Sequence, residues 1–282
     1  ENLLQDAQNE LGSFLPSEAL LGGTAAEDDA LADFLRDRFH TCVNIGTDAQ
    51  FDPALCAAAV TAQFGQSPEA LGLANMPCVI AAAGALLITL RDLQKNELPH
   101  IRALELYIAG KFMQLDLAAR RNLELTETMR AKEKRGSLLW VLDKTKTAMG
   151  GRLLRAWMER PLLSPAQITR RLTAVEELVK KTIDREELIL SLREITDFER
   201  AMTRIMTGTA SCRDLAALSQ GAASLPAVKE RLSGMRSPYL QTLFEQLDTL
   251  ADLKEKIDAT IVDDPPFLLR EGGLIRDGAN KE

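Results

Sequence analysis

From Asp116 onward, apolar residues recur every three or four positions almost without interruption, which is the spacing of amphipathic helices. One stripe consists of Ile168, Leu172, Val175, Leu178 and Val179. A chain that repeats this pattern over more than a hundred residues is expected to fold as a helical bundle. The bundle should end at Asp263-Asp264-Pro265-Pro266, because Pro265 disfavours a helical conformation at Asp264 and neither proline donates a backbone hydrogen bond.

Several helix boundaries can be predicted inside this region. Ser164 to Gln167 has the pattern of a capping box with proline at the first helical position, and Thr196 to Glu199 repeats that pattern. Gly208 is expected to stop the helix that follows. The last long helix is predicted from a set of regularly spaced leucines: Leu240, Leu243, Leu247, Leu250 and Leu253.

The first hundred residues mix helix and strand patterns. Residues 17–21 and 38–45 read as extended, whereas Asp52-Pro53 starts a helix and residues 76–95 form one long helix. Two or three strands are too few for a complete sheet, so this region is predicted to be a partial α/β module whose remaining strands precede residue 1. A short hairpin is expected over residues 103–115.

The 282 residues are enough for two domains, and the charge pattern indicates where they meet. Residues 1–100 carry four Lys/Arg against fourteen Asp/Glu, whereas residues 101–170 carry fourteen against seven, within a chain of net charge −7. We therefore predict an α/β domain at 1–97 and a helical domain at 98–282. Only the middle segment could attract phosphates, although the same charges could simply lie on solvated helix faces.

No catalytic or cofactor site is predicted. The four cysteines form no CxxC pair and there are only two histidines, His40 and His100, so neither a metal site nor a nucleophile-base triad is expected. There is no phosphate-binding loop ending in Gly-Lys-Ser/Thr. No secretory leader opens the chain, and the longest apolar run, Val79 to Leu90, is too short to span a bilayer, so we expect a cytoplasmic protein with no membrane partner.

The densest mixture of polar and apolar residues lies between Gly136 and Trp157. Trp140 and Trp157 are predicted to be buried where two helices meet. Two interpretations of this segment stay open. It could be an ordinary bundle corner with three cations pointing into water, or a junction that contacts another domain or a phosphate through Lys144, Lys146 and Arg152.

This same segment, GSLLWVLDKTKTAMGGRLLRAWMERPL, resembles the core of bacterial MutS proteins. Further blocks agree with it in the same order along the chain: LPHI at 98–101, LDLAARRNLEL at 115–125, DFERAMTRIMTGTASCRDLAAL at 197–218 and DDPPFLLREGGLIRDG at 263–278. The family pattern has Thr where this sequence has Ala119, which removes a possible side-chain hydrogen bond at a helix start.

The resemblance implies a partial connector domain, RNase-H-like in fold, followed by a mainly α core or lever domain that stops before the DNA clamp. It implies that the mismatch-reading domain and the ATPase domain lie outside the chain, so ATP and Mg²⁺ are expected only for the longer parent. The parent would be a homodimer that binds mismatched double-stranded DNA and recruits MutL.

The function implied for this chain is mechanical coupling in DNA mismatch repair: connector and lever would link DNA binding to the ATPase and to MutL recruitment, without catalysis. The alternative is an all-α interaction scaffold unrelated to DNA repair. By itself the chain is expected to bind DNA weakly. It is also expected to self-associate, because the leucine face of its last long helix would lack a cover.

Overall fold

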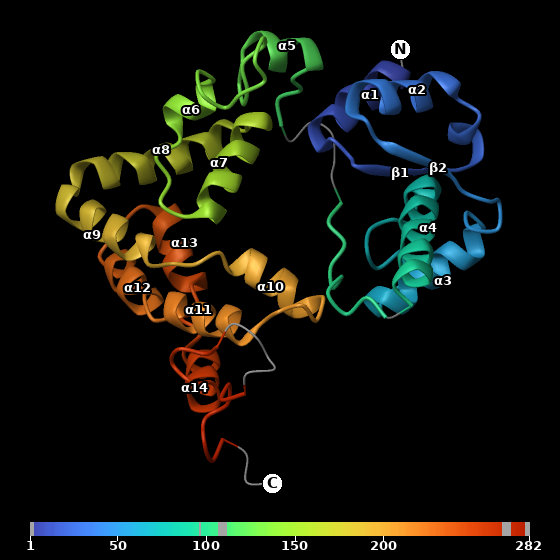
Figure 1. Ribbon diagram of the computed structural model, residues 1–282. Helices are drawn as coiled ribbons and strands as arrows, with labels where there is room; N and C mark the ends of the chain where they lie inside the picture. The colour runs from blue at the N-terminus through green and yellow to red at the C-terminus, as the bar shows by residue number, and fades with distance from the viewer. Residues whose placement is uncertain (1–2, 96, 107–111, 267–271, 280–282) are drawn as a thin grey trace. The chain divides into compact units, whose positions relative to one another are not determined.

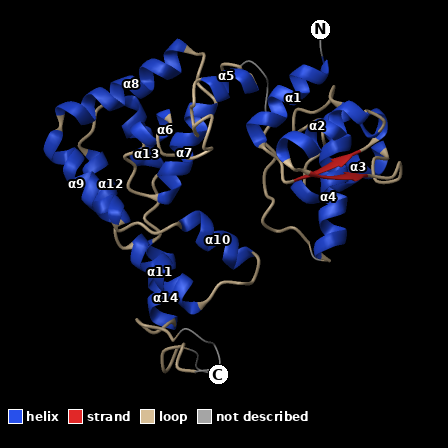
Figure 2. Ribbon diagram, turned by 45° about the horizontal axis from the view of Figure 1, so that its top comes forward, coloured by secondary structure: helices blue, strands red, loops and turns tan. Residues whose placement is uncertain are grey.

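The computed structural model describes residues 3–95, 97–106, 112–266 and 272–279 (Figure 1). The chain divides into two compact units, Glu1–Ile108 and Ala109–Glu282. Helices dominate both, and the described residues contain one sheet of two strands (Figure 2). The predicted fold class, mainly α with a small α/β part near the N-terminus, is confirmed.

The first unit alternates helices and short strands. Its elements in chain order are α1 (Leu3–Phe14), β1 (Glu18–Leu21), a 3-10 turn (Gly23–Ala26), α2 (Asp29–Phe39), β2 (Cys42–Ile45), α3 (Pro53–Phe64) and α4 (Pro77–Gln94). The predicted helix start at Asp52-Pro53 is confirmed, since the Asp52 carboxylate accepts hydrogen bonds from the first turn of α3.

The two strands are parallel, with Glu18 opposite Cys42 and Leu21 opposite Ile45. Parallel neighbours require a crossover, and α2 provides it while burying Leu35 beside the sheet. The extended segment predicted at 17–21 is confirmed. The strand predicted at 38–45 is shorter than expected, because α2 continues to Phe39 and ends at His40 in a left-handed conformation.

Helices α3 and α4 pack against each other at very close range. A Cβ atom placed on Gly84 would lie 2.4 Å from the Cα of Cys56, so glycine is required at this crossing. The helix predicted at 76–95 is confirmed as α4. By length and composition α4 could cross a membrane, which differs from the expectation that its apolar run is too short to do so. It buries Ala85 and Leu87 within this unit.

The second unit consists of short and medium helices joined by tight connections. They are α5 (Leu117–Asn122), α6 (Leu138–Leu142), α7 (Ala148–Glu159), α8 (Pro165–Lys180), α9 (Thr182–Arg193), α10 (Phe198–Met206), α11 (Cys212–Ala222), α12 (Leu225–Ser233), α13 (Pro238–Gln246) and α14 (Ala251–Thr260). The predicted stop at Gly208 is confirmed, because this glycine follows α10 with a φ of +69°.

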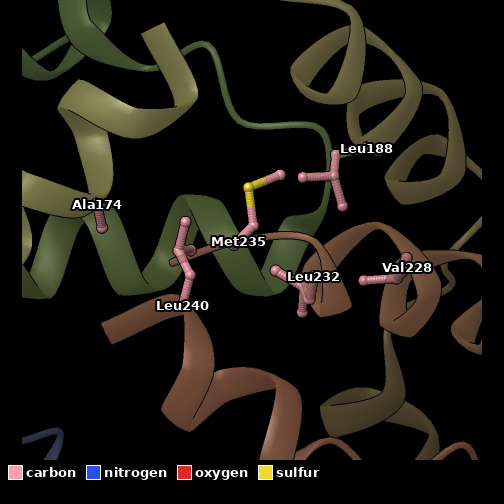
Figure 3. Close-up of a cluster of buried hydrophobic side chains, with 6 residues drawn as sticks. All are labelled: Ala174, Leu188, Val228, Leu232, Met235 and Leu240. Atoms are coloured by element: carbon pink, nitrogen blue, oxygen red, sulfur yellow. The ribbon is translucent and has the colours of Figure 1, made fainter. Parts of the chain in front are cut away.

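Two separate hydrophobic clusters hold the second unit together. The first is formed by α8, α9, α12, α13 and the turn before α13, and Figure 3 shows its buried side chains: Ala174, Leu188, Val228, Leu232, Met235 and Leu240. The second joins α10, α11 and α14 through Ala201, Leu218, Ile257 and Ile261. This unit therefore contains two small cores that are connected through helices.

The last long helix predicted over Leu240–Leu253 is wrong. It is two helices, because the chain is extended at Leu247 and left-handed at Leu250, with a φ of +53°. The regular leucine spacing misled the prediction, since Leu240 belongs to the first cluster whereas Leu253 packs on the second.

The two predicted capping boxes are also wrong. Ser164 makes no side-chain cap to α8, and α10 is capped by Asp197 while the Thr196 hydroxyl donates to the Ala217 carbonyl. A reciprocal capping box does occur at Ser211 and Asp214, before α11. The predicted hairpin turn falls on residues 107–111, outside the described residues, and Phe112 makes an isolated antiparallel bridge to Leu162.

Helix α8 turns most of its predicted apolar face to solvent. Ile168, Leu172, Val175 and Val179 are each more than a third exposed, and we call them the α8 stripe. The side of α8 that faces the first cluster carries Ala174 and Leu178 instead. The helical period was predicted correctly, but the periodicity did not reveal which face would be covered.

Candidate coupling junction

We call residues 136–162, together with α10 and the start of α11, the junction. Its first segment is anchored at residue 137 by a buried serine. Ser137 is fully buried and caps α6 by accepting a hydrogen bond from the Trp140 amide at 3.2 Å, while its hydroxyl donates to the Lys134 carbonyl. The turn before it needs glycine, because Gly136 has a φ of +95°. The amide of the buried Leu139 donates to the Leu125 carbonyl, which ties α6 to the preceding loop.

The loop between α6 and α7 is shaped by its own side chains. Asp143 accepts hydrogen bonds from the amide and hydroxyl of Thr145 and pairs with Lys134. Lys134 is the main reason that the pKa of Asp143 falls to about 2. Lys144 and Lys146 flank Thr145, and both are exposed with no carboxylate partner among the described residues.

Arg152, on the second turn of α7, reaches across to the start of α10. Its two terminal nitrogens donate to the two carboxylate oxygens of Asp197 at 2.9 and 2.6 Å, and its Nε donates to Glu199 at 2.8 Å. This bidentate geometry fixes both direction and distance. The hydrogen bonds from Arg152 lower the pKa of Asp197 to about 2, and the two carboxylates raise the pKa of Arg152 further above its already high value.

Asp197 links this ion pair to the second hydrophobic cluster. Its carboxylate also accepts the Arg200 amide as the N-cap of α10, and the next residue, Phe198, packs against that cluster. At the other end of α10, Arg204 lies 2.6 Å from Asp214 at the start of α11. Helix α10 is therefore held by ion pairs at both ends and by apolar contacts along one side.

The tryptophans are not the buried anchors that were predicted. Trp140 is 48% exposed on α6, and Leu138, Val141 and Leu142 around it are exposed too. Trp157 is half-buried, and the guanidinium of Arg171 from α8 lies 3.6 Å from its ring centroid. Trp157 thus joins α7 to α8 through a cation–π contact.

The three cations predicted from the sequence differ in the contacts that they make. Arg152 bridges two helices inside the second unit, whereas Lys144 and Lys146 are exposed and make no ion pair within the part of the chain that the structure describes. Asp197, Glu199 and the pair Arg204–Asp214 were not predicted as site residues. The alternating charges of DFER, residues 197–200, were a signal of this ion pair. From the sequence alone, however, they indicate only a helix cap.

The described residues contain no group of three or more His, Cys, Asp or Glu side chains that could hold a metal ion. His40 and His100 are both exposed and lie outside the junction. In this arrangement ion pairs connect α7 to α10 and α10 to α11. The fold and these contacts together define a class of protein: a multi-helix domain preceded by a small α/β module.

Comparison with known families agrees with this class and narrows it. The family model for MutS domain III matches residues 118–282, which include the whole junction, and the model for MutS domain II matches residues 1–102. The chain belongs to the MutS family of DNA mismatch repair proteins and covers domain II, the connector, and domain III, the core.

Three curated relatives illustrate the similarity, and each is called DNA mismatch repair protein MutS. The one from Ruminiclostridium cellulolyticum is 40% identical over 97% of this chain, and the one from Acetivibrio thermocellus is 39% identical over all of it. The one from Alkaliphilus oremlandii is 45% identical over 76% of the chain. The alignments cover 31%, 32% and 24% of these relatives' own lengths, so this chain spans about a third of a MutS protein.

Proposed function

We propose that the chain is the mechanical coupling part of a DNA mismatch repair protein, without catalysis of its own. The observation that carries this proposal is the unbroken series of contacts from α7 through Arg152 and Asp197 into α10, and from Arg204 to Asp214 in α11. Helix α7 contacts α8 of the first cluster through Trp157 and Arg171, and it contacts α10 of the second cluster through Arg152 and Asp197. Two small cores linked in this way can shift relative to each other as units, which suits a connector of domains.

The longer parent supplies the remaining parts in this proposal. It binds mismatched double-stranded DNA, hydrolyses ATP with Mg²⁺ outside this chain, recruits MutL and acts as a cytoplasmic homodimer. Within the chain, residues 1–97 act as the connector and residues 98–282 as the core. Lys144 and Lys146 provide the contacts to another domain or to a phosphate, because they are exposed beside the joint and carry no carboxylate partner among the described residues.

The proposal is tested in the full-length protein with Arg152→Gln, which removes the bidentate pair. Basal ATP hydrolysis should stay unchanged while its stimulation by mismatched DNA falls severalfold. Arg155→Gln is the matched control, because the one ion-pair partner of Arg155 among the described residues is Glu159 of its own helix. Equal stimulation in the two variants would show that the junction carries no signal.

The competing interpretation, an all-α scaffold without a role in repair, leaves the family membership unexplained. The two functions also differ in a direct assay. Replacing both Lys144 and Lys146 with Gln should weaken the full-length protein's coupling or DNA binding, whereas a scaffold unrelated to DNA would show neither effect.

A further inference from the structure

The first unit contains a cavity of about 720 Å³ beside the end of α4 and the segment that follows it. Three cations line this cavity: Arg91, Lys95 and Arg102. Residues 1–108 hold only five Lys/Arg in total, against fifteen Asp/Glu. More than half of the positive charge of an acidic unit therefore gathers at one place.

These three cations are not used in ion pairs within the described residues. Arg91 donates to the side-chain oxygen of Gln63 at 2.8 Å, and Arg102 donates through Nε to the Pro99 carbonyl at 3.1 Å. Both partners are neutral, so the charges are oriented but not compensated. By contrast, Arg36 of the same unit pairs with Asp33 on its own helix.

The wall of the cavity is preorganised by Gln63. Its amide nitrogen donates to the carbonyls of Leu98 at 2.8 Å and Ile101 at 2.7 Å, while its oxygen accepts from Arg91. Because Leu98 is buried and packs with Val60 and Leu87, these hydrogen bonds join the cavity to a hydrophobic cluster. A ligand would therefore meet Arg91 already in place, which lowers the entropy cost of binding.

Charge balance selects the kind of ligand. One carboxylate, Glu97, also lines the cavity, and the C-terminal carbonyls of α4 contribute about half a negative charge. The site thus retains about one and a half positive charges. A phosphate group, at about −1.5 to −2 near pH 7, matches this value more closely than a carboxylate does.

We propose that this cavity binds a phosphate group. Arg91 and Arg102 present planar donors to its oxygens, and Lys95 supplies a further charge. The group could come from free phosphate or from a phosphate ester on a small molecule, and both share the chemistry recognised here. This site lies within the first unit and is independent of the coupling proposed for α7 to α11.

Isothermal titration of the 282-residue chain with inorganic phosphate tests the proposal, with acetate and sodium chloride at equal ionic strength as comparisons. Saturable binding of phosphate that acetate does not reproduce supports the site. The absence of saturable binding up to about 10 mM phosphate overturns it. Repeating the titration with a sugar phosphate separates the two sources, since tighter binding than phosphate indicates an ester.

Two variants locate the binding in the cavity. Lys95→Gln and Arg102→Gln should each weaken phosphate binding roughly tenfold, the effect of removing one charged hydrogen-bond donor. Arg38→Gln is the matched control, because it removes the same charge from the exposed end of α2, away from the cavity. Unchanged thermal unfolding shows that the variants are folded, and equal weakening by all three would mean nonspecific attraction and refute the site.

Discussion

At the scale of single residues, Arg152 has the clearest structural role. It contacts two carboxylates on another helix, and its partner Asp197 is also the N-cap of α10. One side chain thereby affects the position of α7, the start of α10 and the second cluster.

Replacing Arg152 with Gln should lower the free energy of unfolding by a clearly larger value than replacing Arg155 with Gln does. The value lies below that of a buried pair, because the Arg152 side chain is 40% exposed and water screens the interaction. Urea denaturation of the isolated chain measures it. Arg155→Gln should change stability by less than about 0.5 kcal/mol, as expected for an exposed pair within one helix; a loss as large as that of Arg152→Gln would contradict the assignment.

The low pKa of Asp197 predicts a specific pH dependence. A carboxyl group whose folded pKa is depressed stabilises the fold above its unfolded pKa of 3.8, and this contribution is lost as pH falls toward about 2. The difference in stability between the wild type and Asp197→Asn should therefore be constant near neutral pH and shrink between pH 4 and pH 2. Melting temperatures across that range provide the test, and a difference that grows on acidification would have the wrong sign.

At the scale of elements, α4 and α8 differ in how closely they approach their neighbours and in how much apolar surface they expose. Helix α4 touches α3 backbone to backbone at Gly84, whereas α8 covers its core with a small residue, Ala174, and leaves the α8 stripe in solvent. Both arrangements depend on side-chain size rather than on hydrophobicity alone. The crossing of α3 and α4 is the more demanding, because backbone atoms cannot move aside as a flexible side chain can.

Gly84→Ala should destabilise the chain by about 1–3 kcal/mol, since the added methyl group would force α3 and α4 apart. Helix propensity alone would give the opposite sign, because alanine is favoured over glycine by about 1 kcal/mol. Gly151→Ala in α7 is the matched control, because its nearest neighbour would be a threonine hydroxyl at 3.4 Å. It should be neutral or stabilising in the same denaturation experiment, and an equal loss in both variants would show that the crossing is not the cause.

At the scale of the whole molecule, two expectations concern partners. Self-association was predicted from the leucine face of the last long helix, but Leu240 is buried in the first cluster. The α8 stripe, with Leu172 60% and Val175 56% exposed, is instead an apolar face of the second unit that is open to solvent. We therefore still expect association through an exposed apolar surface, but through the α8 stripe rather than through the C-terminal leucines.

Light scattering over a concentration series should therefore show association of the 282-residue chain that increases with salt, as hydrophobic contacts do. The double substitution Leu172→Glu and Val175→Glu should restore a monomer, because both side chains are exposed and their replacement leaves the core intact. Leu86→Glu, on the exposed face of α4 in the other unit, is the control and should leave association unchanged. A strict monomer at high concentration would refute the expectation.

DNA binding by the isolated chain should be weak and insensitive to a mismatch. The net charge is −7, and the excess of Lys/Arg is confined to residues 101–170. Any binding should decline steeply with salt, because phosphate contacts release counterions. Fluorescence anisotropy with matched and mismatched duplexes measures this, and a preference for the mismatched duplex in the nanomolar range would show that the chain itself reads the mismatch.

The sequence by itself determined the helical class, the α/β character of the first unit, helices such as 76–95 and the family, because periodicity, turn residues and ordered motifs are local properties of the chain. Only the tertiary structure decided that Leu240 and Leu253 belong to different cores, that Trp140 is exposed, and that Arg152 faces Asp197. These facts depend on which surfaces meet in the folded chain. Arg152 and Asp197, for example, are 45 residues apart in the sequence. A one-dimensional pattern shows that a helix has an apolar face or a charge, but the partner that covers the face or neutralises the charge is chosen by packing in three dimensions.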